Sequence, residues 1–183
     1  MNPIAAGPSS AWLARVAFGL AFWLALAAAA AAATATLEGV VIAVIDGDTV
    51  LFKPDHASAT SRTFMKIRLA AIDAPEADQP YGEAATQALS EQLLKRRVRI
   101  ATVATDGYGR TVARIWLDDL DVNAELVRQG HAWASIWRGQ AELRALQEDA
   151  RRQRRGLWQA DEAVQPWVWR RRQRETTPPS ASR

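Results

Sequence analysis

The chain has 183 residues, of which 23 are basic and 20 acidic, and its formal net charge is +3. This balance is too small to identify a nucleic-acid partner by itself. The absence of cysteine excludes thiol catalysis, cysteine-bound zinc and iron–sulfur clusters, and the presence of only two histidines disfavours a histidine-rich metal site. Any metal must therefore be held by oxygen, which favours a hard cation such as Ca²⁺ or Mg²⁺.

The first 35 residues differ in character from the rest of the chain. Arg15 is the only charged side chain before Glu38, and residues 16–33 are all apolar or small. Ala33-Thr34-Ala35 has the pattern of a signal-peptidase site, so residues 1–35 are predicted to be a signal peptide and the protein to be secreted or periplasmic. The alternative is an uncleaved anchor in the inner membrane facing the periplasm, because the apolar run approaches the roughly 20 residues that span a bilayer.

The remaining residues have the length of one domain with a basic end. Apolar and β-branched residues predict five strands, at 37–45, 49–52, 63–72, 98–103 and 111–117. Amphipathic spacing predicts three helices, at 82–94, 122–129 and 140–154. This order predicts an α+β fold with a mainly β core, a five-stranded OB-type barrel with three helices packed outside. The folded domain is predicted to cover residues 36–160, and residues 161–183 to be a flexible basic tail.

Local signals mark two of the predicted connections. Asp46-Gly47 suits a tight turn between the first two strands. Asp121 or Asn123 could cap the helix at 122–129, and Gly130 stands where a helix commonly ends.

Charged residues stand at the ends of the predicted strands and in their loops. Taken one at a time, each is more common as a turn former, an exposed strand residue or a loop end. Together they form a set that phosphodiester hydrolysis needs: carboxylates to hold a hard cation, guanidiniums to match phosphate oxygens, and a further carboxylate to activate water. The set consists of Asp48, Arg68, Asp73, Glu76 and Arg110.

Five segments of the chain closely resemble, in order and spacing, the staphylococcal nuclease family. They are IDGDTV, IRLAAIDAPE, YGEAA, DGYGR and VNAELVRQG, and the later QEDARRQRRGLW resembles the family's last helix. The resemblance covers about residues 37–158. It implies that residues 36–160 form a nuclease domain with an OB-like barrel. It further implies a Ca²⁺-dependent, sugar-nonspecific endonuclease that cleaves DNA and RNA to 3′-phosphates.

The resemblance also implies the positions of a metal site. Asp48 and Asp73 are expected to bind one Ca²⁺ through their carboxylates, and Ala74 through its backbone carbonyl. The family often has Thr at this last position, and Ala should be tolerated because the ligand is main chain. Asp46 is expected to be an outer carboxylate that lies near the ion without binding it directly.

The same resemblance implies roles in catalysis and substrate binding for further residues. Glu76 is expected to activate water, while Arg68 and Arg110 are expected to hold the scissile phosphate. Tyr108 is expected to contact a phosphate through its hydroxyl. Gly107 stands where a well-known family member has Lys, so one terminal-phosphate contact is expected to be lost.

Tryptophans replace the family's two base-packing tyrosines. Trp133 and Trp137 could provide a stacking surface instead, or could simply pack in the core. Trp167 and Trp169, beside the basic residues 170–172, could contact nucleic acid or a membrane surface, or could belong to a solvated tail.

The rival to an enzyme is a non-catalytic module that binds nucleic acid or a protein on the same barrel, since a fold does not by itself determine function. A pure binder has no need of all five charged residues at once, and this favours the enzyme. DNA and RNA are the expected substrates, and no obligate protein partner is evident. A membrane is expected to be involved only if residues 1–35 are not cleaved.

Overall fold

The computed structural model describes residues 36–56, 63–135 and 141–176. Residues 1–35, on which the prediction of a signal peptide or anchor falls, lie outside this part. Within the described part, no helix is both long and apolar enough to cross a bilayer.

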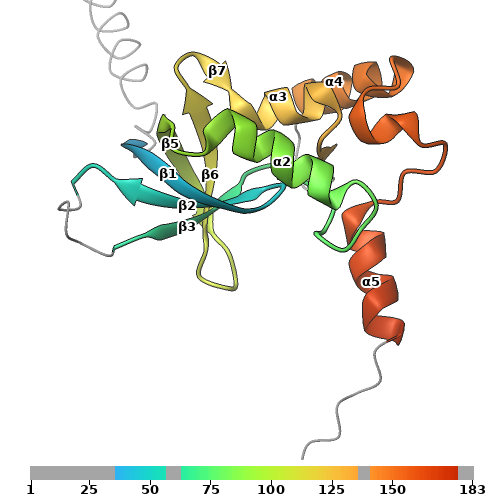
Figure 1. Cartoon of the computed structure of the whole chain (residues 1–183), viewed down its shortest axis with the longest axis horizontal. Helices are drawn as coiled ribbons and strands as arrows, with labels where there is room; N and C mark the ends of the chain where they lie inside the picture. Colours follow the sequence, from blue (N-terminus) through green and yellow to red (C-terminus); the bar gives the residue numbers. More distant parts are fainter. Residues whose placement is uncertain (1–35, 57–62, 136–140, 177–183) are drawn as a thin grey trace, which may run out of the picture. The chain divides into compact units, whose positions relative to one another are not determined.

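Five strands close into a barrel (Figure 1). These are β1 (Thr36–Asp46), β2 (Thr49–Pro54), β3 (Met65–Leu69), β5 (Arg97–Thr105) and β6 (Thr111–Leu117). Their order is β3-β2-β1-β5-β6 with antiparallel neighbours, and a parallel pairing of β3 with β6 closes the ring. The short β7 (Leu120–Asp121) extends the sheet beyond β6. The predicted five-stranded OB-type barrel is therefore confirmed.

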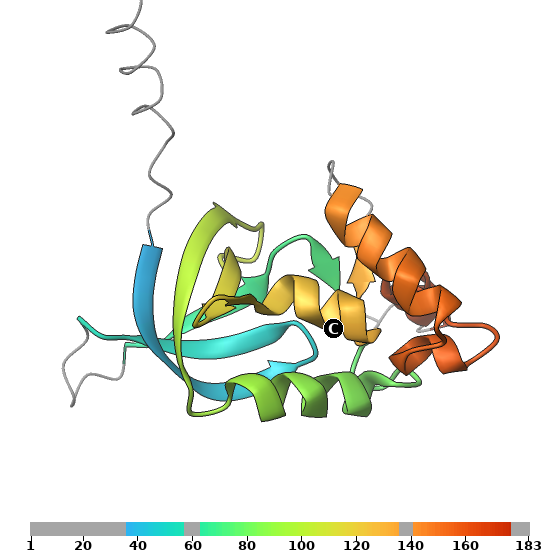
Figure 2. The same ribbon diagram turned by 90° about the horizontal axis from the view of Figure 1, so that it is seen from above.

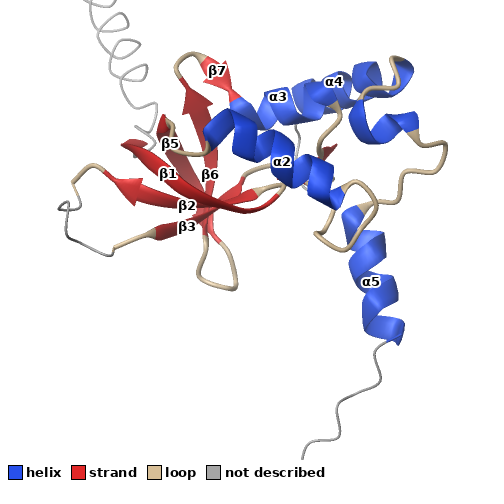
Figure 3. Ribbon diagram, viewed as in Figure 1, coloured by secondary structure: helices blue, strands red, loops and turns tan. Residues whose placement is uncertain are grey.

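In the described part of the chain, four α-helices accompany the barrel, where the sequence predicted three. They are α2 (Gly82–Leu93), α3 (Val122–Gln129), α4 (Ala141–Arg152) and α5 (Pro166–Thr176), and a 3₁₀ turn, η1 (Gly156–Gln159), follows α4. Figure 3 shows α3, α4 and α5 gathered to one side of the strands, and Figure 2 shows α2 running beneath the barrel. The fourth helix, α5, lies within residues 161–183, so the prediction of a flexible tail is wrong for residues 166–176.

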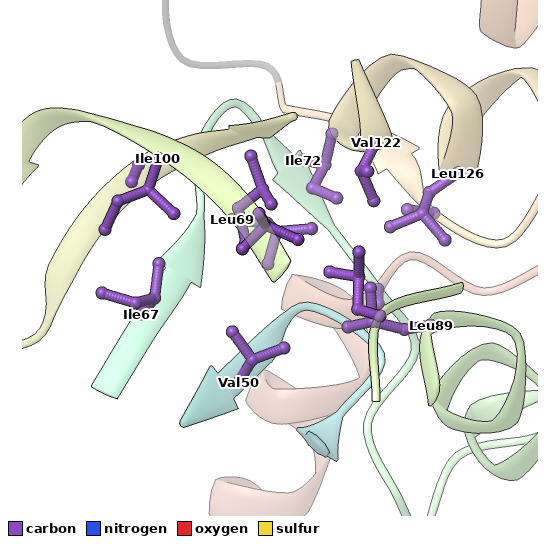
Figure 4. Close-up of a cluster of buried hydrophobic side chains, with 14 of the residues drawn as sticks. Val50, Ile67, Leu69, Ile72, Leu89, Ile100, Val122 and Leu126 are labelled. Atoms are coloured by element: carbon purple, nitrogen blue, oxygen red, sulfur yellow. The ribbon is translucent and has the colours of Figure 1, made fainter. Parts of the chain in front are cut away.

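The core joins the inner face of the barrel to α2 and α3. Figure 4 shows apolar side chains from both layers meeting in one cluster, labelled Val50, Ile67, Leu69, Ile72, Leu89, Ile100, Val122 and Leu126. All eight are buried. Alternation along the strands sends the intervening side chains outward, which puts Arg68 on the opposite face of β3 from its buried neighbours Ile67 and Leu69.

The predicted strand 63–72 is two strands rather than one. β3 ends at Leu69, and β4 (Ile72–Asp73) follows a bend at Ala71, whose φ is +62°. β4 leaves the barrel and pairs with β8 (Trp133–Ala134) in a separate two-stranded sheet. The bend was not predicted because Ala71 is a residue that rarely takes a left-handed conformation. Its consequence is that Asp73 lies beyond the barrel rim.

A buried asparagine holds this bend to the barrel. The Asn123 side chain accepts a hydrogen bond from Ile115 N (3.0 Å) and donates to the carbonyls of Ala70 (2.9 Å) and Ala113 (3.3 Å). Asn123 is therefore not the cap of α3. Asp121 caps it by accepting from Ala124 N (3.1 Å), and Gly130 ends it in the left-handed conformation, as predicted.

The three side-chain hydrogen bonds of Asn123 are expected to contribute to the stability of the fold. Replacing Asn123 with Ala leaves buried backbone groups without partners, and each such group costs about 1–3 kcal/mol. We expect Asn123→Ala to lower the free energy of unfolding by about 2–4 kcal/mol, measured by urea denaturation. Gln87→Ala on the exposed face of α2 is the control and should change it by no more than about 0.5 kcal/mol. An equally small effect of Asn123→Ala would contradict this role.

Candidate active site

The turn between β1 and β2 presents a buried carboxylate. Asp46 Oδ1 accepts a hydrogen bond from the backbone N of Asp48 (3.0 Å), which shapes the turn. Gly47 is packed so closely that a Cβ there would lie 2.7 Å from the Cβ of Ala74. The turn is thereby pressed against the residue that follows β4. Asp48, only 2% exposed, points its carboxylate toward the same place.

Arg68 on β3 bridges the two buried carboxylates. Its Nη1 donates to Asp48 Oδ1, and its Nη2 donates to Asp73 Oδ1 at 2.7 Å. The other Asp48 oxygen, Oδ2, accepts from the backbone N of Ala74 at 2.9 Å. Three separate segments, the β1–β2 turn, β3 and β4, therefore meet at one guanidinium.

Glu76 lies on a turn after Pro75 that is held by Gln79, a residue for which the sequence predicted no role. Gln79 is buried, and its Oε1 accepts from the backbone N of Glu76 (3.2 Å). Its Nε2 donates to the carbonyl of Val164 (2.6 Å), just before α5. Gln79 thus connects the Glu76 turn to the segment that leads into the last helix.

The loop between β5 and β6 supplies Arg110 and Tyr108. Asp106 orders the loop, because its carboxylate accepts from the backbone N of both residues and from Arg110 Nε (2.7 Å). The Arg110 guanidinium carbon lies 5.5 Å from the centre of the Tyr108 ring. The ring is 88% exposed, so the loop offers an aromatic face and a positive charge together.

These segments line a single cleft of about 620 Å³, within the roughly 300–1,000 Å³ of typical ligand sites. Its lining residues are Asp46, Asp48, Lys66, Arg68, Ala74, Pro75, Glu76, Tyr108, Arg110, Arg170 and Arg174. Asp73 adjoins the cleft through its bonds to Arg68 and Arg170. The structure therefore brings together eight of the ten residues predicted for the site.

The two tryptophans are the remaining predicted site residues. Trp133 is 3% exposed and packs edge-on against Trp158, with ring centres 4.2 Å apart. It belongs to a small apolar cluster with Ala150, Leu157 and Trp158 and offers no surface for stacking on a base, so of the two alternatives for Trp133 the structure shows core packing and contradicts stacking. Trp137 lies outside the described residues.

Helix α5 brings an unpredicted arginine into the site. Arg170 donates from Nη2 to Asp73 Oδ2 (2.8 Å), and from Nη1 to Asp73 Oδ1 (3.2 Å) and to Glu76 Oε1. The hydrogen bond to Asp73 is the main reason that the pKa of Arg170 is raised, and the bond to Glu76 adds to it. Partial burial acts in the opposite direction but is outweighed. Residues 167–176 contain neither Gly nor Pro and follow Pro166, so the sequence permitted a helix but did not show where it would dock.

The donor set suits a hard cation, since it consists of oxygens only. Four carboxylates, those of Asp46, Asp48, Asp73 and Glu76, lie in or beside the cleft, and two guanidiniums, Arg68 and Arg170, are bonded to them. Among the residues described, no three acidic or histidine side chains approach closely enough to hold a metal ion. In this structure the carboxylates of Asp48 and Asp73 are instead bonded to the guanidiniums of Arg68 and Arg170.

Burial dominates the electrostatics of Asp48. It raises the pKa of the Asp48 carboxyl from 3.8 to about 7; Arg68 and the Ala74 N–H oppose the rise, and the charges of Asp46 and Asp73 add to it. Burial disfavours the charged form of Arg68 as well, but Asp48 and Asp73 outweigh this and raise the pKa of the guanidinium. Asp48 is therefore a buried carboxylate whose charged form depends on the groups bonded to it, namely Arg68 and the Ala74 N–H.

Several known proteins are similar to this chain over most of its length, and nucleases are among them. A family model described as staphylococcal nuclease homologue matches residues 66–160. The chain is 40% identical over 149 residues to "Protein ParB" of Escherichia coli, covering 75% of this chain and 81% of that protein. It is 34% identical over 155 residues to "Micrococcal nuclease" of Shigella flexneri, with coverages of 78% and 86%. It is 36% identical over 140 residues to an "Uncharacterized endonuclease" of Escherichia coli O157:H7, with coverages of 75% and 88%.

The raised pKa of Asp48 predicts a pH dependence of stability. Because the pKa is higher in the folded than in the unfolded state, the stabilisation by the extra proton is complete below about pH 4 and is lost as the pH rises through about 7. Asp48→Asn keeps the shape without the charge. Between pH 5 and pH 8, in the presence of a chelator, its stability relative to wild type should rise by about 2–3 kcal/mol. Urea unfolding followed by tryptophan fluorescence measures this, and a pH-independent difference would show that Arg68 keeps Asp48 ionised throughout.

Proposed function

Because this chain belongs to the staphylococcal nuclease family, we propose that it is a Ca²⁺-dependent endonuclease that hydrolyses phosphodiester bonds in DNA and RNA and leaves 3′-phosphates. The observation that carries the proposal is the hydrogen-bonded cluster of Asp48, Arg68 and Asp73 at a cleft that Glu76 and Arg110 also line. A barrel that only bound nucleic acid would have no use for buried carboxylates beside the strand, since they repel phosphates.

One Ca²⁺ is assigned to the carboxylates of Asp48 and Asp73 and to the backbone carbonyl of Ala74, with Asp46 as a neighbouring negative charge. When bound, the ion supplies positive charge that polarises the scissile phosphate. The two carboxylates already lie within hydrogen-bonding distance of the same guanidinium, so little rearrangement of the backbone is needed to bring them to one ion.

Hydrolysis then uses groups that face the cleft. Glu76 accepts a proton from water as the water oxygen forms a bond to phosphorus. The bond from phosphorus to the 5′ oxygen breaks, and that oxygen takes up a proton from solvent, so the products are a 3′-phosphate and a 5′-hydroxyl. Arg68 and Arg110 donate to the non-bridging oxygens, on which negative charge increases in the transition state.

Arg170 takes part as a positioning residue in this scheme. It joins Asp73 to Glu76 through one guanidinium, so it holds the base and a metal ligand in a defined relation. Glu76 remains about one-third exposed at its side chain, which leaves it accessible to water.

Cleavage by this protein is proposed to occur outside the cytoplasm, in the periplasm or the medium. The support is the apolar segment 16–33 followed by the small residues Ala33-Thr34-Ala35. Export would give the enzyme access to nucleic acids outside the cell and keep it from the cell's own.

The first test of the function is cleavage by the purified protein. We expect it to degrade denatured DNA and RNA with Ca²⁺ and to lose activity when a chelator is added. Glu76→Gln should lower kcat by about 10²–10⁴-fold, the contribution of a general base. Arg110→Ala should cost about 10²–10³-fold, since one donor to the developing charge is removed.

Glu83→Gln makes the same chemical change as Glu76→Gln at an exposed position on α2 outside the cleft, and it should leave kcat unchanged. Equal activity of Glu76→Gln and Glu83→Gln would remove Glu76 from the mechanism. No cleavage by the wild-type protein with any divalent ion, together with intact binding, would favour the non-catalytic module.

The proposed export has a separate test. N-terminal sequencing of protein recovered from the periplasm or medium is expected to begin at Thr36, directly after Ala35. Recovery of the full-length chain in the membrane fraction would instead support an anchor.

A further inference from the structure

The cations of the cleft divide into two kinds. Arg68, Arg110 and Arg170 each form an ion pair with a carboxylate of the site or its loop. Lys66 and Arg174 line the same cleft, and neither has a hydrogen-bond or ion-pair partner in the described part of the chain. An anion can therefore bind these two without displacing a carboxylate.

Lys66 lies beside the cluster along β3. It precedes Arg68 by two residues, so the alternation of the strand puts both side chains on the same face, roughly 7 Å apart at the backbone. Lys66 is exposed, whereas Arg68 is half-buried against its carboxylates. Lys66 therefore adds a positive charge on the same face of β3, farther from the buried carboxylates and in contact with solvent.

On α5, Arg174 lies beside Arg170 in the same way that Lys66 lies beside Arg68 on β3. The two residues are four apart, which puts them on the same face of the helix about 6 Å apart along its axis. Figure 1 shows α5 and the loop that joins β5 to β6 projecting on the same side of the molecule, and residues of both line a common hollow beside Arg68. Arg174 therefore stands farther out along the wall on which Arg170 meets the carboxylates.

The helix that carries Arg174 is docked rather than loose. Asp78 accepts hydrogen bonds from Trp169 Nε1 (3.1 Å) and Gln173 Nε2 (3.4 Å). Trp167 packs edge-on against Trp133 with ring centres 6.0 Å apart. These contacts lie on both sides of Arg170, so the face of α5 that presents Arg174 has a defined direction.

We propose that Lys66 and Arg174 form a second phosphate-binding subsite, which holds the phosphodiester next to the scissile one. This inference rests on the proposed function and specifies its substrate: a polynucleotide strand that continues past the cleavage site, rather than a single isolated phosphodiester. Lys66 lies two strand residues from Arg68, and Arg174 lies about one helical turn from Arg170, so each is roughly 6–7 Å along the backbone from a group of the cluster, a spacing that suits the next phosphate of an extended strand. Since no carboxylate of the described segments is bonded to either cation, a phosphate can bind both without breaking an ion pair.

The direct test measures binding in the absence of cleavage. The binding of a fluorescently labelled single-stranded oligonucleotide is measured by fluorescence anisotropy, with chelator present and at several salt concentrations. The reference protein carries Glu76→Gln, and the test proteins carry Lys66→Ala, Arg174→Ala or both in addition. We expect the double change to raise Kd about tenfold or more. Each single change should reduce the slope of log K against log salt by about 0.7, the loss of one phosphate contact on a single strand.

Arg172→Ala is the matched control, since it removes the same charge from the same helix but does not line the cleft. It should leave the slope unchanged. Equal effects of Arg172→Ala and Arg174→Ala would overturn the subsite and indicate a general effect of charge. Thermal unfolding of each variant verifies that α5 and the barrel remain folded.

A kinetic test separates the subsite from the cleavage site. On an otherwise wild-type background with Ca²⁺, Lys66→Ala/Arg174→Ala should raise KM for an oligonucleotide about five- to tenfold and leave kcat/KM for a dinucleoside monophosphate unchanged. An equal loss with both substrates would overturn the proposal. Absence of cleavage by the wild-type protein would instead refute the proposed function, while the anisotropy measurement would still decide on the subsite.

Discussion

The guanidinium of Arg68 between the carboxylates of Asp48 and Asp73 is the interaction on which the rest of the site depends. Removing water from such a group of charges is costly, and apolar residues of similar size would commonly stabilise a fold as well or better. Removing one partner alone leaves an uncompensated buried charge, at a cost of about 3–5 kcal/mol. The cluster is therefore weak evidence for stability, and what it does in the structure is keep three chain segments in contact at one point.

Several structural features follow from that requirement. Gly47 allows the first turn to press against the end of β4, and the bend at Ala71 carries Asp73 off the barrel and back toward Arg68. Asn123 ties this bend to β6. Arg170, from almost 100 residues farther along the chain, joins Asp73 to Glu76. Paired cations thus hold the carboxylates in place, while the cations without partners lie farther out, where a charged substrate can approach them.

Much of the barrel could be predicted because its determinants are local. Alternating apolar residues, the Asp46-Gly47 turn, the cap at Asp121 and the stop at Gly130 each act within a few residues. The predictions were wrong where distant contacts decide the outcome. Trp133 is core because Trp158 and Trp167 cover it, and residues 166–176 are a docked helix because Asp73, Glu76 and Asp78 supply partners for a segment that is strongly basic by itself.

The sequence by itself determined the family, the number and order of the barrel strands, and the identity of the charged residues that could serve a phosphodiesterase. It did so because these properties reside in residue types and in their spacing along the chain. Only the tertiary structure decided which charges neutralise one another and that α5 forms a wall of the cleft. It also decided that Lys66 and Arg174 have no ion-pair partner among residues 36–56, 63–135 and 141–176. Such pairings depend on distances between segments far apart in sequence, and neither composition nor periodicity records those distances.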